Sequence, residues 1–468
     1  MSLLAPPFAP EIYQQRRDKL AQWMRQHGGG VMIIPNGQAP LRSEYAEYPF
    51  RFDSQFYYLS GFTEQKAWLV LHVTPTDTQS LLFCQDKNEQ TEIWEGLLWG
   101  PQAAQTAFGF DEAHTIDQLE IWMRQHLAQT PNIWFPIQRC AVENLPQTFK
   151  TWLTQSRQAQ RHQTAHAPRW MDITPIVSQM RQIKDAHEIA TMRRAGQIAA
   201  HAHCEAMRRA RPGLTERVLQ AQLFYTFLTE GAQDVAYDTI VATGANACIL
   251  HHRAGHDIIG PDDLILIDAG CELDGYASDI TRTFPASGHF SSVQADLYDI
   301  VLHAQEAAIA VTQPGASFNA AHEAAVEVIT QGLVDEKLLR GTVSGLIEQG
   351  AYQRFYMHRT GHWLGLDVHD VGAYRQSDSQ GKALQTTAQQ APWVNLEPGM
   401  VLTIEPGLYI RPDADIPERY WNQGIRIEDD ALITQTGCEL LTRDVPVTRH
   451  AIETLMQEHL DPKKASNE

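Results

Sequence analysis

The sequence predicts an α/β (α+β) protein with two domains, residues 1–175 and 176–468, and a pseudo-symmetric second domain built around a curved antiparallel sheet. Three observations support this fold class. A chain of 468 residues is too long for one ordinary core. Short apolar strands alternate with amphipathic stretches. An apolar strand that ends in a carboxylate occurs twice, at Asp263–Gly270 and at Met400–Gly407, which indicates two related halves flanked by helices.

The first domain is predicted to alternate strands and helices. Amphipathic periodicity favours helices at Ile12–Gln26 and Ile116–Gln129. Short runs rich in Val, Ile and Leu predict strands at Gly30–Pro35, Ala67–Val73, Gln79–Cys84 and Asn132–Pro136.

The second domain is predicted to open with a capped helix. Asp185 is a good N-cap residue, and Glu188 stands where a glutamate completes a capping box. This helix should run to Arg211, because Pro212 and Gly213 follow it. Later helices are expected at Thr215–Thr229, Ser292–Thr312 and Phe318–Leu333.

Composition restricts the partners. The formal net charge is -19, so phosphate backbones are repelled, no nucleic-acid binding is expected, and a substrate that carries an ammonium group is favoured. The apolar runs are of strand size, so no membrane span is expected. The first ten residues lack the pattern of a secretory signal, and the six cysteines form no CxxC pair. These features predict a cytoplasmic protein with reduced thiols.

A hairpin brings two aspartates together. Residues Leu264 to Phe284 read as two strands that turn at Asp274-Gly275, a dipeptide that tolerates positive φ. Because the turn is centred on residues 274 and 275, the numbers of two residues that face each other across the hairpin add up to about 549. Asp268 and Asp279 then become diagonal neighbours on one face of the hairpin.

Further carboxylates stand in similar contexts. Glu405 and Glu428 also follow short apolar runs, as Asp268 does, and buried carboxylates are costly unless something compensates their charge. A structural ion pair between Asp268 and Arg282 is one alternative. The other is a pair of divalent cations that activate water.

One histidine is expected to complete this set. His358, His362 and His369 lie in a segment interrupted by Gly361 and Gly365. The glycines argue against a helical pair of zinc ligands, so at most one of His358 and His362 need bind metal. Ligands that are mostly oxygen, with one imidazole, favour Mn²⁺.

Several segments resemble the pita-bread metallopeptidases, and specifically the aminopeptidase P group, the Xaa-Pro aminopeptidases. In the second domain they are Leu266–Cys271, Ser278–Phe284, Gly361–His369, Leu402–Leu408 and Gly424–Asp429. In the first domain they are Arg42–Tyr45 and Phe56–Phe62. The resemblance covers nearly the whole chain, and it implies a pita-bread catalytic domain behind an aminopeptidase P-type N-terminal domain.

The resemblance implies a ligand set for two Mn²⁺ ions per subunit. Asp279 and Glu428 would bridge the ions, Asp268 would bind one of them, and His362 with Glu405 would bind the other. Water activated by both ions would be the nucleophile.

The resemblance also assigns the remaining site residues. Glu405 would carry a proton to the leaving prolyl nitrogen, and His369 would stabilise the tetrahedral intermediate. His251, His358 and Arg426 would line the pocket for proline and the substrate backbone, with the two histidines counted among the catalytic residues. His252 has no such match and is interpreted as structural. Trp94 would reach the site of a neighbouring subunit in a homo-oligomer, a dimer or a tetramer, or would pack in the core.

The predicted activity is release of the first residue from peptides with proline in second position. One alternative is prolidase, which cuts only Xaa-Pro dipeptides, and another is a metal-free peptide-binding relative that has lost activity. The segment from Arg375 to Asn395, rich in Gln and Ala, departs from the shorter bacterial pattern and is interpreted as an inserted loop.

Overall fold

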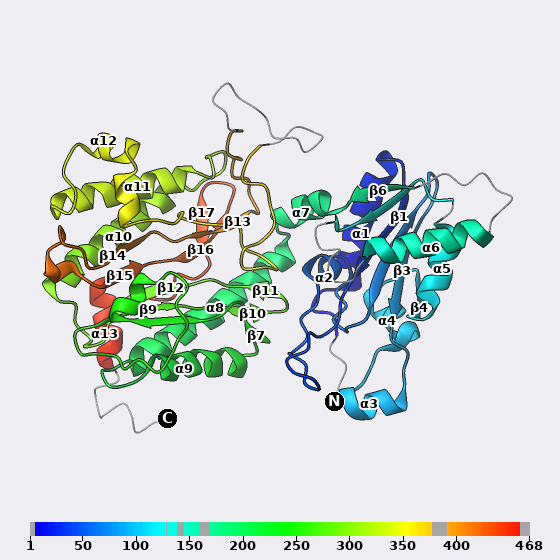
Figure 1. The fold of residues 1–468 in the computed structure, drawn as a ribbon, viewed down its shortest axis with the longest axis horizontal. Coiled ribbons are helices and arrows are strands. Elements are labelled where there is room, and N and C mark those ends of the chain that lie inside the picture. The colour runs from blue at the N-terminus through cyan, green and yellow to red at the C-terminus, as the bar shows by residue number, and fades with distance from the viewer. Residues whose placement is uncertain (1–4, 128, 138–144, 160–167, 377–390, 459–468) are drawn as a thin grey trace. The chain divides into compact units, whose positions relative to one another are not determined.

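The structure, a computed structural model, describes residues 5–127, 129–137, 145–159, 168–376 and 391–458. The chain folds as two units, Met1–Met180 and Arg181–Glu468, hereafter unit 1 and unit 2 (Figure 1). The predicted boundary between residues 175 and 176 concerns functional domains and stays a prediction.

Unit 1 is built on a six-stranded mixed sheet with the order β4-β3-β2-β1-β5-β6. Its three central strands are antiparallel, and its outer pairs are parallel. The four predicted strands are all present: one has the predicted ends, and each of the other three differs by one residue at one end. The strands are β1 (Gly30–Pro35), β2 (Trp68–Val73), β3 (Thr78–Cys84), β4 (Glu112–Thr115), β5 (Asn132–Phe135) and β6 (Arg169–Asp172).

Helices surround this sheet, as expected for strands that are apolar on both faces. Leu119 and Met123, for example, pack with Val31, Ile33 and Val70 in one buried cluster. The two predicted helices are confirmed. The helices are α1 (Pro10–Gln26), α2 (Ser54–Ser60), α3 (Glu89–Glu95), α4 (Gly100–Phe108), α5 (Gln118–His126), α6 (Leu145–Ala159) and α7 (Thr174–Gln182), which ends just beyond the division between the units.

Unit 2 contains the predicted hairpin in the predicted register. β9 (Leu264–Asp268) pairs antiparallel with β12 (Thr281–Pro285), and Asp268 lies opposite Thr281. β10 (Cys271–Leu273) and β11 (Tyr276–Ala277) continue the same register to the turn. Asp274 and Gly275 have φ angles of 49° and 83°, so both residues adopt the conformation that this turn requires. β7 (Asp234–Val235) and β8 (Ile240–Thr243) extend the two parts of the hairpin.

The second carboxylate-ending strand lies in a matching antiparallel arrangement. β13 (Val401–Ile404) pairs with β16 (Asp429–Ile433), which pairs with β17 (Cys438–Leu440). β14 (Gly407–Ile410) pairs with β15 (Gln423–Arg426). An isolated β-bridge between Thr281 and Glu428 joins this half to the hairpin. The predicted fold class is therefore confirmed.

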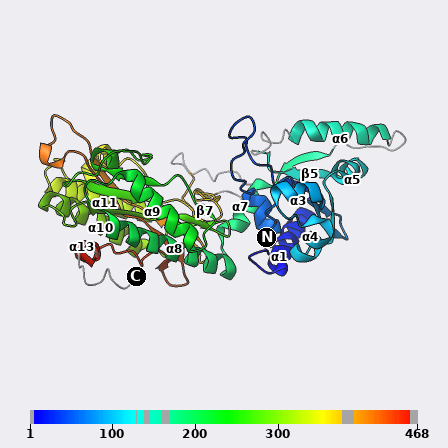
Figure 2. The same cartoon turned by 90° about the horizontal axis from the view of Figure 1, so that it is seen from below.

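Helices pack on these strands. The capping box of α8 (Ala186–Arg209) is present, and α10 (Ser292–Val311) begins with a second one. Figure 2 shows α8, α9 (Glu216–Thr229), α10 and α11 (Ala320–Asp335) gathered on one side of unit 2. The shorter helices are α12 (Val343–Glu348), α13 (Arg449–Gln457), η2 (Gly244–Cys248), η3 (Ala351–Arg354) and η4 (Glu418–Tyr420).

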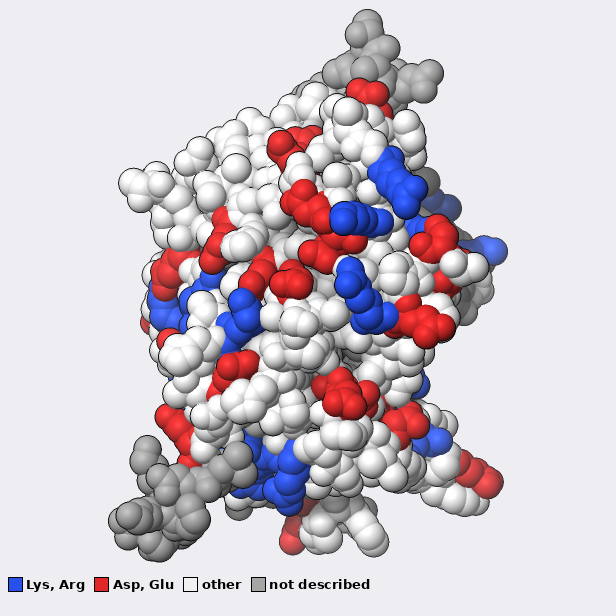
Figure 3. All heavy atoms as spheres, turned by 90° about the vertical axis from the view of Figure 1, so that its left-hand side faces the viewer, with Lys and Arg blue, Asp and Glu red and all other residues white. Residues whose placement is uncertain are grey.

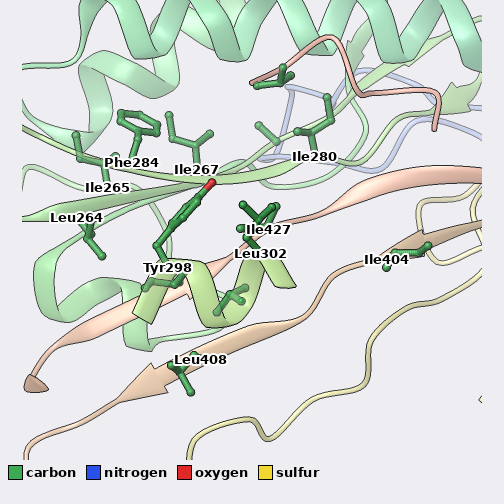
Figure 4. Packing of buried hydrophobic residues seen from close by; sticks show 14 of the residues in the cluster. Leu264, Ile265, Ile267, Ile280, Phe284, Tyr298, Leu302, Ile404, Leu408 and Ile427 are labelled. Atoms are coloured by element: carbon green, nitrogen blue, oxygen red, sulfur yellow. The ribbon is translucent and has the colours of Figure 1, made fainter. Parts of the chain in front are cut away.

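The core of unit 2 lies between these helices and the strands (Figure 4). Ile265 and Ile267 of β9 and Phe284 of β12 belong to one buried cluster with Tyr298 and Leu302 of α10. Burial of these side chains stabilises the strands whose ends carry the polar residues. A rigid layer therefore supports the carboxylates.

Charged side chains of both signs are interspersed on the face of the molecule in Figure 3. Among the described residues, no helix combines the length and the apolar composition that crossing a membrane requires. The described cysteines, Cys84, Cys204, Cys248, Cys271 and Cys438, are free.

Candidate metal centre

All five residues predicted to bind metal line one cavity of unit 2, with a volume of about 530 Å³. The four carboxylates stand at or beside the ends of strands, where the backbone leaves the sheet and the side chain can turn inward, and the histidine lies in a segment without regular structure. These residues are Asp268, Asp279, His362, Glu405 and Glu428.

The hairpin supplies the two aspartates as expected. Asp268 ends β9, and Asp279 lies two residues before β12. The hydroxyl group of Tyr237 lies 2.6 Å from Oδ1 of Asp268 and 2.5 Å from Oδ1 of Asp279. One phenol therefore spans both carboxylates, which places them within reach of a common cation pair.

The other half of unit 2 supplies the two glutamates. Glu405 follows β13, and Glu428 lies between β15 and β16. The hydroxyl group of Thr281 donates to Oε2 of Glu428 at 2.6 Å, across the bridge that joins the two halves. Glu428 is 2% exposed and Asp279 is 4% exposed, so their charges are almost wholly removed from water.

His362 lies in a non-helical segment, as its neighbouring glycines predicted. Its Nδ1 lies 3.0 Å from the carbonyl oxygen of Trp363, which favours a proton on Nδ1 and leaves Nε2 for the cavity. Nε2 lies 3.4 Å from Oδ2 of Asp279 and 3.8 Å from Oε1 of Glu405. The imidazole thus faces the carboxylates with the nitrogen that a metal would use.

Burial and mutual repulsion disfavour negative charge on these carboxylates. Burial raises the pKa of Glu405 to about 7, with contributions from Asp279 and Asp268 that His362 and Arg426 oppose. Burial and the neighbouring carboxylates also raise the pKa of Glu428 well above its ordinary range. The cluster is electrostatically incomplete without additional positive charge.

His362 responds to the same imbalance. Burial alone would lower its pKa, but the hydrogen bond to Asp279 and the charges of Glu405 and Asp279 raise it to about 9. A protonated imidazole therefore stands where cations would compensate the carboxylates.

The donor set fits divalent metal. One ligand atom from each of Asp279, His362 and Glu428 lies within 4.8 Å of the others. Carboxylate oxygens with one imidazole nitrogen suit Mn²⁺ and related divalent ions.

The other predicted site histidines surround this centre. The rings of His369 and His362 lie 4.0 Å apart between centroids, and His251 lines the same cavity. Nδ1 of His358 lies 3.8 Å from Oε2 of Glu405. Burial and the nearby Arg426 lower the pKa of His358 to about 3, so its ring is neutral.

Arg426 is the buried counter-ion of Asp268. Its Nη2 lies 2.5 Å from Oδ2 of Asp268, and its Nη1 donates to the hydroxyl group of Tyr409 at 2.8 Å. The alternative ion pair between Asp268 and Arg282 is wrong. Arg282 pairs instead with Asp429 at 2.8 Å, because both point to the opposite side of the strands from the cavity.

Three sequence predictions lie away from this cluster or at its edge. Trp94, on α3 of unit 1, is 87% exposed, so the alternative that it packs in the core is wrong, and its reach to a neighbouring subunit stays a prediction. His252 lines the cavity and lies 2.8 Å from Oε2 of the buried Glu216, a contact that anchors its loop. Most of the Arg375–Asn395 insertion, residues 377–390, lies outside the described residues.

Two tyrosines contact the site residues although no sequence motif singles them out. Tyr237 spans the aspartates, and the hydroxyl group of Tyr409 lies 2.8 Å from Nε2 of His358 while it accepts from Arg426. Tyr409 follows Glu405 by four residues but lies one residue beyond the segment Leu402–Leu408 that carries the resemblance. Tyr237 stands just before a strand without any motif of its own.

Known proteins share this fold and sequence along the whole chain. Residues 190–435 match the metallopeptidase family M24, and residues 13–134 match the aminopeptidase P N-terminal domain. The Xaa-Pro aminopeptidase of Escherichia coli is 40% identical over 445 residues, which are 95% of this chain and 97% of that protein.

Solved structures of aminopeptidases share the fold of this chain. The aminopeptidase PepP of Pseudomonas aeruginosa is 40% identical with a TM-score of 0.90, over 97% of this chain and 99% of that one. Zinc-substituted aminopeptidase P of Escherichia coli, solved in complex with product, is 39% identical with a TM-score of 0.88, again over 97% and 99%.

The chain therefore belongs to metallopeptidase family M24, and within it to the aminopeptidase P type with its characteristic N-terminal domain. It carries the dinuclear metal-binding site of that family.

Proposed function

We propose that this chain hydrolyses the peptide bond between a free N-terminal residue and a proline in second position. It is a dinuclear metallopeptidase with Xaa-Pro aminopeptidase activity. The observation that carries this function is the convergence, in one cavity, of four carboxylates and one imidazole from both halves of unit 2.

The proposed ligand assignment uses two Mn²⁺ ions per subunit. Asp279 and Glu428 would bridge the ions, Asp268 would bind one ion, and His362 with Glu405 would bind the other. When bound, the ions lower the pKa of water and stabilise negative charge on the substrate carbonyl oxygen. The hydrogen bonds from Tyr237 and Thr281 support this assignment, because they orient the bridging carboxylates.

Proton transfer is proposed for Glu405. Its carboxylate lines the cavity 3.8 Å from Nε2 of His362, so it is placed to accept the proton that the attacking water loses. We propose that it passes this proton to the prolyl nitrogen, which must become an amine to leave.

Neutral and cationic side chains complete the proposed pocket. Burial lowers the pKa of His369, with further lowering by His362 and His251, so it enters the reaction neutral and can donate one hydrogen bond to the tetrahedral intermediate. His251, His358 and Arg426 line the cavity and are proposed to hold the proline ring and the substrate backbone. Trp94 is proposed to contribute from a neighbouring subunit.

The acidic cluster also explains why only the first residue is removed. The free α-ammonium group of a peptide is attracted to a cavity rich in carboxylates, whereas an internal amide is not. We propose that the substrates are peptides that begin Xaa-Pro. We further propose that the chain forms a homo-oligomer in the cytoplasm, and that residues 1–175 and 176–468 are its functional domains. Size measurement by light scattering and cell fractionation test the assembly and the compartment.

Hydrolysis of a matched tripeptide and dipeptide tests the function. The Mn²⁺-loaded chain should cleave Ala-Pro-Gly-amide, and chelation should abolish this activity. A chain that cleaves the dipeptide Ala-Pro, but no peptide of three or more residues, would be a prolidase. A chain that binds peptide without metal and without turnover would be an inactive relative. In Asp279→Asn a bridging anion becomes a neutral amide, so turnover should be lost while the circular dichroism spectrum is retained.

A further inference from the structure

The cavity is lined by three arginines whose charges are balanced differently. Nη2 of Arg426 lies 2.5 Å from Asp268, and Nη2 of Arg253 lies 3.1 Å from Asp238. Arg359 lines the same cavity and is exposed at its rim. Among the residues that the structure describes, no carboxylate lies within ion-pair distance of Arg359, so it is the one arginine of this wall without an ion pair.

Neutral groups hold Arg359 in place. Its Nη2 donates to the amide oxygen of Asn319, and its guanidinium carbon lies 4.6 Å from the ring centroid of Trp393. Asn319 is itself held, because its amide nitrogen donates to Glu323 at 2.7 Å. The side chain is thus positioned by a hydrogen bond and a cation–π contact, neither of which neutralises it.

A second cation lies against the same ring. The guanidinium carbon of Arg375 is 3.4 Å from the ring centroid of Trp393. Burial lowers the pKa of Arg359, and the charge of Arg375 lowers it further, against Tyr356, Tyr352 and the nearby Glu323, which raise it. The guanidinium group of Arg359, which has no ion pair among the described residues, favours an anionic ligand at this rim.

We propose that Arg359 binds a carboxylate group of the peptide on the C-terminal side of the scissile bond. This inference rests on the proposed function and names a preference within its substrate class. The acidic cluster attracts the α-ammonium group of the peptide, so a carboxylate at the cationic rim gives the substrate a direction that matches the field of the cavity. A guanidinium group binds a carboxylate with two parallel hydrogen bonds, which a lysine cannot reproduce.

This carboxylate has two sources: the C-terminus of a tripeptide or an acidic third residue. Four substrates separate them: Ala-Pro-Gly, Ala-Pro-Gly-amide, Ala-Pro-Asp-amide and Ala-Pro-Asn-amide. With the Mn²⁺-loaded chain, we expect kcat/KM to be about tenfold higher for at least one carboxylate peptide than for its neutral partner, mainly through KM, since a hydrogen bond to a charged group contributes on that scale. The pair that shows the preference identifies the source.

Variants assign the preference to this residue. Arg359→Gln should abolish the difference within each pair, and Arg359→Lys should retain part of it. Arg253→Gln is the matched control, because Arg253 lines the same cavity but is already paired with Asp238, so the preference should persist. Equal losses on charged and neutral peptides in Arg359→Gln, or loss of the preference in Arg253→Gln, would overturn the assignment.

A binding measurement separates this inference from the proposed function. By calorimetry, the Mn²⁺-loaded chain should bind Pro-Leu about tenfold more tightly than Pro-Leu-amide, or Pro-Asp-amide about tenfold more tightly than Pro-Asn-amide, and Arg359→Gln should remove the difference. If no Xaa-Pro peptide is cleaved but a difference of this kind holds, the proposed function fails and the carboxylate site stands. If cleavage occurs and the two members of each pair bind equally to the unmodified chain, the function stands and the carboxylate site is refuted.

Discussion

Glu428 and Asp429 are neighbours in the chain, both are buried, and their surroundings are opposite. Glu428 faces the carboxylates of the cavity, and its pKa is raised well above the ordinary range by burial and by Asp279, Glu405 and Asp268. The pKa of Asp429 is lowered, because Arg282 and Arg443 outweigh its burial. Adjacent residues of a strand point to opposite faces, so one peptide step separates these two environments.

The fold compensates buried negative charge in two different ways. On the side of Asp429 the protein supplies its own cations, with Arg282 at 2.8 Å and Arg443 at 2.7 Å. On the side of Glu428 the cations within the described residues are fewer than the carboxylates, and the deficit matches the role of bound metal. One cluster is built for stability, and the other is built to be completed by ligands.

Among the substitutions that test this comparison, Glu428→Gln should change kcat/KM the most. Loss of a ligand that bridges the ions should lower kcat/KM by more than the roughly 100-fold that loss of an outer-shell partner costs. The metal-free melting temperature at pH 8 should rise, because an uncharged amide removes a buried acid whose folded pKa is raised. Steady-state kinetics and thermal unfolding check the two parts, and a fall in metal-free stability would contradict the comparison.

Asp429→Asn should lower the stability of the fold and leave metal binding intact, the reverse of Glu428→Gln. It leaves the buried Arg282 without its charged partner, and breaking a buried ion pair of this kind costs about 3–5 kcal/mol. The melting temperature should fall strongly, and Mn²⁺ measured in the folded fraction should still bind. Loss of metal binding with unchanged stability would show that the two clusters are not separate.

The stability of the metal-free chain should depend on pH. The pKa of Glu405 is raised from 4.5 to about 7, so its protonation stabilises the fold below pH 4.5, and this contribution is lost as the pH rises to about 7. His362, raised from 6.5 to about 9, stabilises the fold below pH 6.5 and loses its contribution as the pH rises through about 9.

The melting temperature of the chelated chain should therefore fall between pH 5 and pH 9, values chosen to bracket roughly these transitions. Saturating Mn²⁺ should remove most of this fall, because metal replaces the protons that the cluster otherwise needs. Differential scanning calorimetry at several pH values tests this, and a metal-free chain that grows more stable with pH would rule it out.

The smallest effect is expected for Tyr237→Phe. This variant removes the hydroxyl group that lies against Asp268 and Asp279, a contact outside the proposed ligand set. Activity or Mn²⁺ affinity should fall by about 10- to 100-fold, as for other partners that orient metal ligands. Thr226→Val is a control, because its hydroxyl group is also buried but bonds only within α9. An effect of similar size in both variants would indicate a general loss of packing.

Local signals were enough to predict the scaffold of the site. The Asp274-Gly275 turn determines the register of the hairpin, because both residues tolerate positive φ and the pairing then follows by counting. The capping box at Asp185 and Glu188 likewise needs only residues three apart. These features depend on neighbours in the chain, so periodicity and turn chemistry contain the necessary information.

The two-domain α/β architecture, the hairpin and the set of carboxylates at strand ends follow from patterns in the sequence. The three-dimensional fold was needed to show which cation meets which carboxylate: Arg426, and not Arg282, pairs with Asp268 across 158 positions of the chain. It also decided that Tyr237 spans two aspartates and that Arg359 lacks an acidic partner among the described residues. Coulomb energy and hydrogen bonding depend on distance in space, which strand periodicity restricts to a face but does not specify between distant segments.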